Sequence, residues 1–308
     1  MDYTQAAQQI SQLVSNISQV IKGKDEVIRL ILMGFISEGS VLLRDVPGVG
    51  KTVLAKALAK SIHGDFKRIQ FTPDLMPTDI TGLNIFNQKD REFEFKPGPV
   101  FTNILLADEI NRTTPKTQSA LLEAMEEKQV TVDGTIYTLP KPFFVIATQN
   151  PIDHDGTYPL PVAQLDRFSI RTAIGFPNKE VEIEIFKNQI SAYDPIKNIS
   201  AVCSSDDILR WQEALKSIKV HEKIYEYLAE IALQSRSVQT ESGGLSTRAM
   251  LRLCRVAMAS ALMNGRDYVA IEDIKRVIYN VLEHRLSYSE NNAIAKIDEI
   301  LSRITISY

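Results

Sequence analysis

The spacing of hydrophobic and polar residues predicts a mixed region of helices and strands followed by a helical region. Apolar side chains recur at helical spacing in residues 5–22, in Asp25–Ile36 and in Pro115–Glu127, which predicts three helices with one buried face each. Short apolar or alternating runs between them predict the strands of a parallel sheet. These strands are expected at residues 41–43, 66–71, 104–107, 143–148 and 168–174.

Two β-hairpins are expected as insertions between these elements. Residues 83–86 and 91–95 alternate apolar and polar side chains on either side of a polar turn, which predicts one hairpin. Residues 129–139 carry Asp133 and Gly134 between two alternating segments, and Asp-Gly is a strong signal for a two-residue hairpin turn. We expect insertions of this kind to carry contacts with partners.

After residue 177 the strand patterns stop and helical spacing takes over. We therefore place a domain boundary near residues 176–178, with a plausible helix stop at Gly265 further on. The predicted fold class is α/β: residues 1–177 form a core around a parallel sheet with two inserted hairpins, and residues 178–308 form an all-helical domain. Its helices are expected at residues 181–189, 206–217, 222–235, 246–264, 271–282 and 293–301.

Composition adds that the chain is an ordinary globular protein of 308 residues, with 44% hydrophobic and 24% charged residues. A net charge of -3 gives no footprint of a general nucleic-acid binder. No apolar stretch is long enough for a membrane span and no export signal precedes the first helix, so a cytoplasmic protein is expected. Cys203 and Cys254 are expected as free thiols. The histidines receive no catalytic role, because they are scattered at positions 63, 154, 221 and 284.

The segment around Lys51 has the order that a phosphate-binding loop needs: an apolar strand, a glycine turn, Gly50-Lys51-Thr52 and then a helix. Backbone N–H groups at the helix start would bind phosphate oxygens, Lys51 would add a positive charge, and Thr52 would hold Mg²⁺. One departure is that Asp45 stands where the usual pattern has its first glycine. The alternative is an ordinary strand-turn-helix junction that contains these residues by chance.

Asp108 and Glu109 come directly after the strand at residues 104–107. Because the carboxyl ends of parallel strands meet at one edge of a sheet, this pair is expected beside Lys51 and Thr52. Asp108 would then bind Mg²⁺, and Glu109 would orient or deprotonate the water that attacks the γ-phosphate. A helix cap is the alternative for the acidic pair. Asn150 follows the next strand and is a further candidate for contacting this water or the γ-phosphate.

Two arginines are candidates for phosphate contacts. Arg248 lies in the first turn of a helix capped by Ser246, where a positive charge opposes the helix dipole, so an anionic neighbour is expected. Arg167 fits a phosphate-sensing arginine and a structural ion pair equally well.

The chain resembles the MoxR family of AAA+ ATPases over nearly its whole length. The motifs that carry the resemblance are IKGKDEV (21–27), LLRDVPGVGKT (42–52), LLADEINRTTPKTQSALLEAMEEKQVTVDG (105–134), ATQNPIDHDGTYPLPVAQLDRF (147–168) and GLSTRAMLRL (244–253). The resemblance implies a P-loop core with two inserted hairpins, a helical lid and a ring, usually hexameric, in which ATP and Mg²⁺ sit between core, lid and neighbour.

Each candidate residue takes a role under this resemblance. Asp108 and Thr52 would bind the metal, and Glu109, Asn150, Arg167 and Arg248 would be the water-activating acid, the first sensor, the arginine finger and the second sensor. Whether Arg248 acts within its own subunit or on the next one varies in this group. The nucleotide-binding residues would be Gly23, Pro47, Gly48, Val49, Gly50, Lys51, Thr52, Val53 and Asp108.

Three positions depart from the general patterns. Val162 stands where relatives commonly carry glutamate, and His154 lies in a loop that is usually acidic or rich in amides, so no role is assigned at these loop positions. Asp45 is a frequent variant in the family and does not argue against ATP binding.

The leading functional hypothesis is an ATP-hydrolysing, chaperone-like enzyme that remodels or activates protein complexes, with partners that often carry a von Willebrand factor A domain. A second hypothesis is a nucleotide-gated binding module with incidental turnover. A helicase-like motor is disfavoured, because the hairpins carry Asp79, Glu92, Glu94 and Asp133 where a nucleic-acid channel would carry Lys or Arg.

Overall fold

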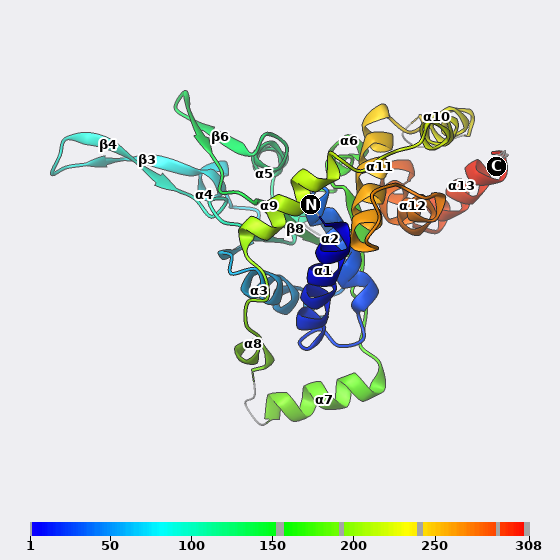
Figure 1. The fold of residues 1–308 in the computed structure, drawn as a ribbon. Coiled ribbons are helices and arrows are strands. Elements are labelled where there is room, and N and C mark those ends of the chain that lie inside the picture. Colours follow the sequence, from blue (N-terminus) through cyan, green and yellow to red (C-terminus); the bar gives the residue numbers. More distant parts are fainter. Residues whose placement is uncertain (1, 152–156, 191–193, 239–242, 288–289, 305–308) are drawn as a thin grey trace.

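The computed structural model describes residues 2–151, 157–190, 194–238, 243–287 and 290–304. Figure 1 shows a central sheet from which the hairpins project on one side and the C-terminal helices on the other, with α7 standing apart. The first part of the chain contains α1 (Tyr3–Ser18), α2 (Asp25–Ile36), β1 (Val41–Arg44), α3 (Lys51–Ser61), β2 (Phe66–Gln70), α4 (Pro77–Thr81), β3 (Gly82–Asn87), β4 (Glu92–Pro97), β5 (Ile104–Asp108), η1 (Ile110–Arg112), α5 (Pro115–Glu127), β6 (Gln129–Val132), β7 (Thr135–Thr138), β8 (Phe144–Gln149), α6 (Val162–Leu165) and β9 (Ile170–Thr172).

The described strands of the main sheet are all parallel and have the order β2-β5-β8-β1-β9. In the central strands β1, β5 and β8, alternate residues enter different cores, as the two-residue period of a strand requires. In β1, Val41 and Leu43 pack on the side of α1, α2 and α3, whereas Leu42 packs on the side of α5. Burial on both faces explains why these strands are continuous apolar runs in the sequence.

The two predicted hairpins are present as β3–β4 and β6–β7, each antiparallel and separate from the main sheet. Asp133 adopts φ 49° and Gly134 φ 81°, the left-handed backbone that an Asp-Gly turn provides. The hairpins lie beside each other, because Phe95 stacks on Tyr137 with ring centroids 3.8 Å apart and Asn84 donates to Asp133 at 2.7 Å. They form one arm, which we call the hairpin arm.

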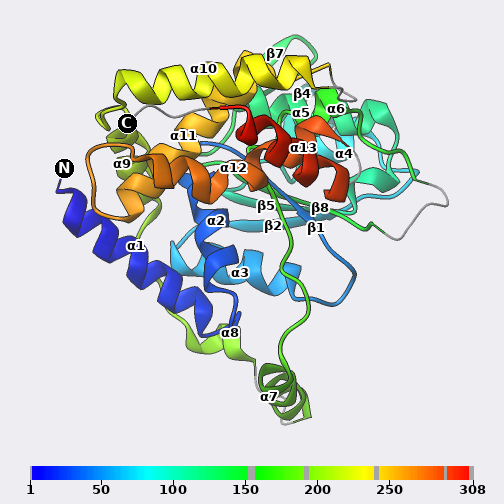
Figure 2. The same ribbon diagram turned by 90° about the vertical axis from the view of Figure 1, so that its right-hand side faces the viewer.

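The remaining elements are helices: α7 (Lys179–Ile190), α8 (Pro195–Asn198), α9 (Ser205–Leu215), α10 (Glu222–Ser237), α11 (Thr247–Met263), α12 (Ile271–Leu286) and α13 (Glu290–Ser302). Buried residues of α9, α10, α11 and α12 join those of α1, α2 and one sheet face in a single hydrophobic cluster. The helical part is thus packed onto the sheet domain, while α7 leads the chain away and back (Figure 2).

The predicted fold class is confirmed, and the differences are local. The short helices α4, α6 and α8 were not predicted, because four or five residues are too few to establish a periodic pattern. The last strand is shorter than expected and is limited to β9. His154 lies outside the described residues. In the described part of the chain, no helix has the length and apolar character needed to cross a membrane.

Candidate functional site

The loop between β1 and α3 has the backbone of a phosphate-binding loop. Gly48 and Gly50 adopt φ 88° and 97°, which a residue with a Cβ would adopt only under strain, and Gly50 is the N-cap of α3. Lys51 is buried in the first turn, and its Nζ donates to the backbone oxygen of Asp45 at 3.0 Å. The N-terminus of α3 and the Lys51 ammonium therefore present positive charge at the carboxyl end of β1.

Asp45 has a structural role that explains why it replaces a glycine. Its side chain is only 5% exposed, and its carboxylate accepts hydrogen bonds from the backbone N–H groups of Ile174 and Gly175, the latter at 3.1 Å. Two N–H donors compensate for the burial of this charge. Asp45 thus ties the phosphate loop to the segment that follows β9.

A cavity of about 490 Å³ opens beside the loop. This volume lies in the range of small-molecule sites. Lys24 donates to the backbone oxygen of Phe176 at 2.8 Å, and Lys22 pairs with Glu184 of α7, so the N-terminal turn and α7 face each other across it. Gly23, with φ 69°, lies between two lining residues but is not a lining residue itself. The cavity is lined on four sides by residues Val20–Lys22, Gly48–Gly50, Ile174–Gly175 and part of α7.

The acidic pair lies at the carboxyl edge of the same sheet. Asp108 is the last residue of β5, and Thr148 belongs to the neighbouring strand β8. The Thr148 hydroxyl donates to Asp108 Oδ1 at 2.6 Å. The Glu109 backbone N–H donates to the same Thr148 oxygen at 2.8 Å. Asn150, which follows β8, is buried at this edge. Since β8 lies between β5 and β1, the topology brings the acids, Asn150 and the phosphate loop to one edge.

Glu109 is held in an unusual conformation. Its backbone has φ 59°, which costs energy for a residue with a side chain and is typical of functional positions. Its carboxylate accepts a hydrogen bond from Gln70 Nε2 at 2.7 Å and pairs with Arg112 at 3.2 Å. The acid is therefore oriented by three constraints rather than free to rotate.

Arg68 of β2, which sequence reasoning missed together with Gln70, contacts the other acid. Its guanidinium donates to Asp108 Oδ2 through Nη2 at 2.6 Å and through Nε at 3.1 Å. The same Nη2 donates to Gln70 Oε1 at 2.8 Å. In β2, residues 68 and 70 share one face of the strand, and this alternation is the only signal in the sequence that could have paired them.

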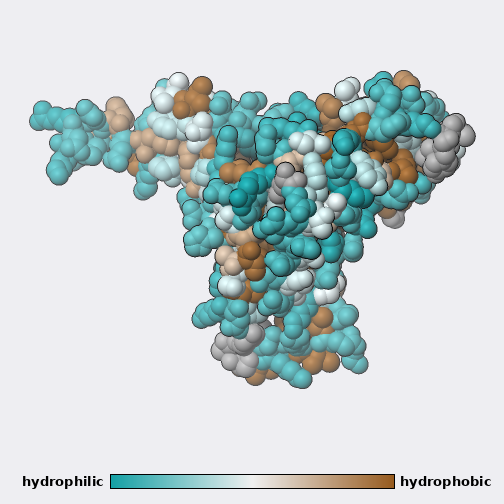
Figure 3. All heavy atoms as spheres, viewed as in Figure 1, coloured by the Kyte–Doolittle hydropathy of each residue, from teal (hydrophilic) through white to brown (hydrophobic). Residues whose placement is uncertain are grey.

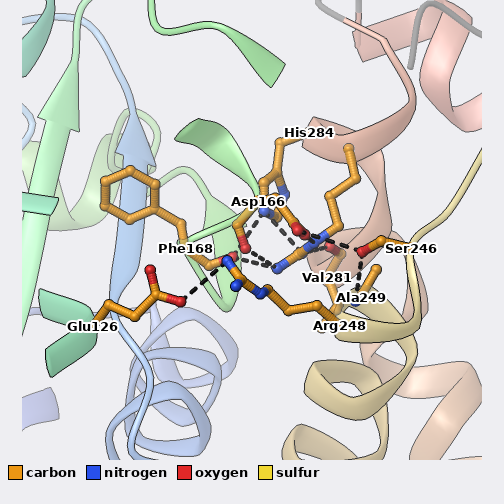
Figure 4. A network of polar contacts seen from close by, with 9 residues as sticks. Glu126, Asp166, Phe168, Ser246, Arg248, Ala249, Val281 and His284 are labelled. Atoms are coloured by element: carbon orange, nitrogen blue, oxygen red, sulfur yellow. Dashed lines mark hydrogen bonds and ion pairs between the residues drawn. The ribbon is translucent and has the colours of Figure 1, made fainter. Parts of the chain in front are cut away.

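Arg167 and Arg248 lie elsewhere. Both pair with Glu126 of α5: Arg167 at 3.4 Å, and Arg248 at 3.1 Å, the pair that Figure 4 shows. They line one surface hollow together with Gly39 and Ser40, which immediately precede β1. The phosphate loop follows β1, so the two arginines lie toward the opposite end of this strand. The position of Arg248 in the first turn of a helix predicted an anion beside it. Within the chain, the Glu126 carboxylate is such an anion.

A buried network of polar contacts lies next to Arg167 and Arg248 and involves Asp166 and Ser246, which are close to them in the sequence. Arg285 of α12 pairs with Asp166 at 2.6 Å and donates to the backbone oxygen of Phe168 at 2.6 Å. Ser246, the N-cap of α11, contacts the same Asp166 (Figure 4). Burial and the charge of Arg285 hold the pKa of His284 well below its ordinary value, so this histidine is neutral and structural.

Similarity to known proteins decides the family. The model of the ATPase family associated with various cellular activities (AAA) matches residues 40–170, and the AAA lid domain matches residues 233–304. Over 307 residues, the chain is 41% identical to the chaperone MoxR1 of Mycobacterium tuberculosis, with 97% of this chain and 80% of the relative covered. The chain belongs to the MoxR family of AAA+ ATPases.

Two further relatives cover almost the full length of this MoxR-family chain. An uncharacterised protein of Bacillus subtilis, YeaC, is 45% identical over 303 residues, covering 96% of this chain and 94% of the relative. A crystal structure of a candidate ATPase from Cytophaga hutchinsonii superimposes with a TM-score of 0.89 at 38% identity, covering 100% of this chain and 97% of the other. The match includes both the sheet domain and the lid.

The residues present fit the magnesium ion that nucleotide binding in this family implies. Mg²⁺ prefers oxygen ligands, and the Thr52 hydroxyl and the Asp108 carboxylate both offer them. The Asp108 side chain is 12% exposed and already has a cation, Arg68, against Oδ2. A positive charge is therefore favourable at this carboxylate.

The edge that carries Arg167 and Arg248 holds more positive charge than the sequence motifs indicate. Arg252 lies one turn after Arg248. Its pKa is lowered mainly by burial and, to a lesser extent, by repulsion from Arg255. Burial, with a further contribution from Arg252, lowers the pKa of Lys128 to about 8. The hollow is lined by Arg167, Arg248 and Arg252 and by the acids Glu38 and Glu126, so cations outnumber acids among its lining residues, which favours the approach of an anion.

Proposed function

We propose that this MoxR-family chain binds and hydrolyses ATP with Mg²⁺, and that it uses the energy to remodel or activate partner protein complexes. The observation that carries the proposal is the convergence of Lys51, Asp108, Glu109 and Asn150 at one edge of the sheet, beside a cavity of about 490 Å³. This arrangement has the parts that phosphoryl transfer needs: a phosphate cradle, metal ligands and a residue to position water.

Each residue of the candidate site would have a task in this reaction. The N-terminus of α3 and Lys51 bind the phosphates, while the cavity beside Val49 and α7 takes the nucleoside. Thr52 and Asp108 would hold Mg²⁺, which neutralises charge on the β- and γ-phosphates when bound. Glu109 would orient a water molecule and accept its proton, and Asn150 would hydrogen-bond this water or the γ-phosphate.

We infer that the working form is a ring, as the family resemblance implies, in which Arg167 of one subunit completes the site of the next. Its location toward the far end of β1 from the phosphate loop supports this inference, because it lies away from the acids of its own chain. Arg248 pairs with the same Glu126, so we assign it to the same intermolecular contact.

The hairpin arm supports a role in partner binding. Apolar side chains are exposed along it, among them Ile136 and the contacting rings of Phe86 and Phe93, the latter 73% exposed. Figure 3 shows hydrophobic areas on this arm among hydrophilic ones. Contiguous exposed apolar residues mark protein interaction sites. The name of the relative MoxR1 describes a chaperone. We propose client complexes as the target, with a von Willebrand factor A domain protein as partner.

The test is a comparison of ATP turnover in the wild type, Glu109→Gln and Glu123→Gln. We expect Glu109→Gln to lose about 100-fold in kcat while it retains ATP binding, because general-base catalysis contributes on that order. Glu123 is exposed on α5, so the matched control should keep wild-type turnover. Equal background rates in the wild type and Glu109→Gln would contradict hydrolysis and favour a nucleotide-gated binding module.

The client can be sought with the same variant. Affinity capture of Glu109→Gln in the presence of ATP should retain the assembled ring and its partner, because hydrolysis would no longer release them. The Lys51→Ala chain, which should bind no nucleotide, is the control. Identical captured proteins with both chains would contradict a role for ATP in partner binding.

A further inference from the structure

We propose that Arg68 is a positioning residue that occupies the Asp108 carboxylate when no metal is bound and is displaced from it by the arriving Mg²⁺-nucleotide. This inference rests on the proposed function and concerns the regulation of the same site. Arg68 holds Asp108 Oδ2 at 2.6 Å, and the Thr148 hydroxyl holds Oδ1 at 2.6 Å. Both oxygens of the carboxylate that would bind metal therefore already have a partner.

Burial explains why Asp108 needs a counter-ion. The Asp108 side chain is only 12% exposed, and a buried carboxylate without a positive partner is unstable. Arg68 supplies this charge through Nη2 and Nε. A second cation at the same carboxylate would face repulsion from the guanidinium, so the metal and Arg68 compete.

Arg68 can leave at little cost. Its side chain is 46% exposed and belongs to β2, which lies at the edge of the described sheet. The guanidinium can therefore return to water once the metal has taken over the charge of Asp108. The Arg68 Nη2 group also donates to Gln70 Oε1 at 2.8 Å, so the guanidinium keeps one partner on its own strand after it releases Asp108.

The position of Gln70 favours this arrangement. Its amide oxygen accepts from Arg68 and its amide nitrogen donates to Glu109, so only one orientation of the amide satisfies both neighbours. Arg68, Gln70 and the two acids thus form one continuous chain of contacts. When a metal displaces Arg68, the metal therefore enters a site whose acids are already held in place by these contacts.

The test measures how a fluorescent ADP analogue binds as Mg²⁺ is titrated, with the wild type, Arg68→Gln, Arg68→Lys and Lys67→Gln. For Arg68→Gln we expect the Mg²⁺ concentration at half-maximal binding to fall about tenfold, which corresponds to a site closed by Arg68 nine times in ten. Nucleotide affinity in EDTA should change less than twofold. Arg68→Lys, which keeps the charge but loses the two-pronged contact, should lie in between.

Lys67→Gln is the matched control, because it removes one positive charge from the adjacent exposed residue of β2. It should behave as the wild type. An unchanged or higher Mg²⁺ requirement in Arg68→Gln, with a wild-type melting temperature, would overturn the inference and leave the proposed function standing. Failure of the wild type to bind nucleotide at any Mg²⁺ concentration would overturn both.

Discussion

The carboxyl edge of the sheet and the edge that carries Arg167 are built in opposite ways. At the carboxyl edge, Lys51, Asp108 and Asn150 are buried, and the cavity beside the phosphate loop is lined by residues of this one chain. At the other edge, Arg167 and Arg248 are partly exposed, and the acid between them is Glu126. The first edge has a cavity for a ligand within the chain, whereas the second presents partly exposed arginines at the surface.

Under the proposed function, this difference means that the candidate catalytic residues of one chain would not form one complete site. A strand of four residues spans about 13 Å. This is longer than an arginine side chain, so an arginine at one end of β1 cannot reach the other end. The two sets of residues would meet only when the second edge of one chain faces the first edge of another. In the proposed ring, assembly would then be a condition of ATP turnover.

The largest expected effect comes from Arg167. Arg167→Ala should lower ATP turnover about 1000-fold, the order known for arginine fingers, while ATP binding by the subunit is kept. Mixing this variant with Lys51→Ala, which is itself inactive, should restore part of the turnover, because Arg167 of the Lys51→Ala chain completes intact phosphate loops. Turnover of the mixture is the measurement. No recovery, with mixed rings demonstrated, would mean that Arg167 acts within its own chain.

Asp45 tests the prepared character of the carboxyl edge. Asp45→Gly restores the usual loop glycine, yet we expect it to lower the free energy of unfolding by about 2 kcal/mol, because the N–H groups of Ile174 and Gly175 lose a charged acceptor. Asp45→Asn keeps one acceptor oxygen and should lose less. Denaturant unfolding of both variants measures the effect. A more stable Asp45→Gly chain would show that the aspartate is not needed to tie this loop to β9.

Lys128 gives a smaller effect, which reports the burial of this cation and, to a lesser extent, its repulsion from Arg252 near the second edge. Its pKa is about 8 in the folded chain and 10.5 when unfolded, so above pH 8 the folded chain loses this proton first. The unfolded state then binds more protons, and stability should rise by about 1 kcal/mol between pH 8 and 9 relative to Lys128→Met. Thermal unfolding at several pH values measures it. Parallel pH profiles of the two chains would contradict the lowered pKa.

Local signals in the sequence were enough for the fold and for half of the candidate site. Lys51 and Thr52 begin the helix that follows a glycine loop, and Asp108 and Glu109 stand at the end of an apolar strand, so the local pattern itself locates them. The Asp-Gly turn in one hairpin and the Ser246 cap of α11 were readable for the same reason. These features depend on neighbours within a few positions.

The contacts that control these residues could not be read in this way. Arg68 is 40 positions from Asp108, and Arg285 is 119 positions from Asp166. Nothing near Arg68 in the sequence distinguishes it from any exposed arginine on a strand, and it becomes specific only when β2 pairs with β5. The departure at Asp45 was visible, but its reason lies in backbone groups about 130 positions away.

The ion pair between Lys22 and Glu184 has a consequence for the timing of the cycle. It connects the N-terminal turn to α7 across the cavity, and its side chains are 42% and 43% exposed. An exposed pair is weakened by salt, so the wall formed by α7 should open more often as ionic strength rises. Product ADP would then leave faster in high salt, which stopped-flow release of a fluorescent ADP can measure. The rate of the proposed ATPase cycle would then be set partly by an exposed ion pair in the wall of the cavity.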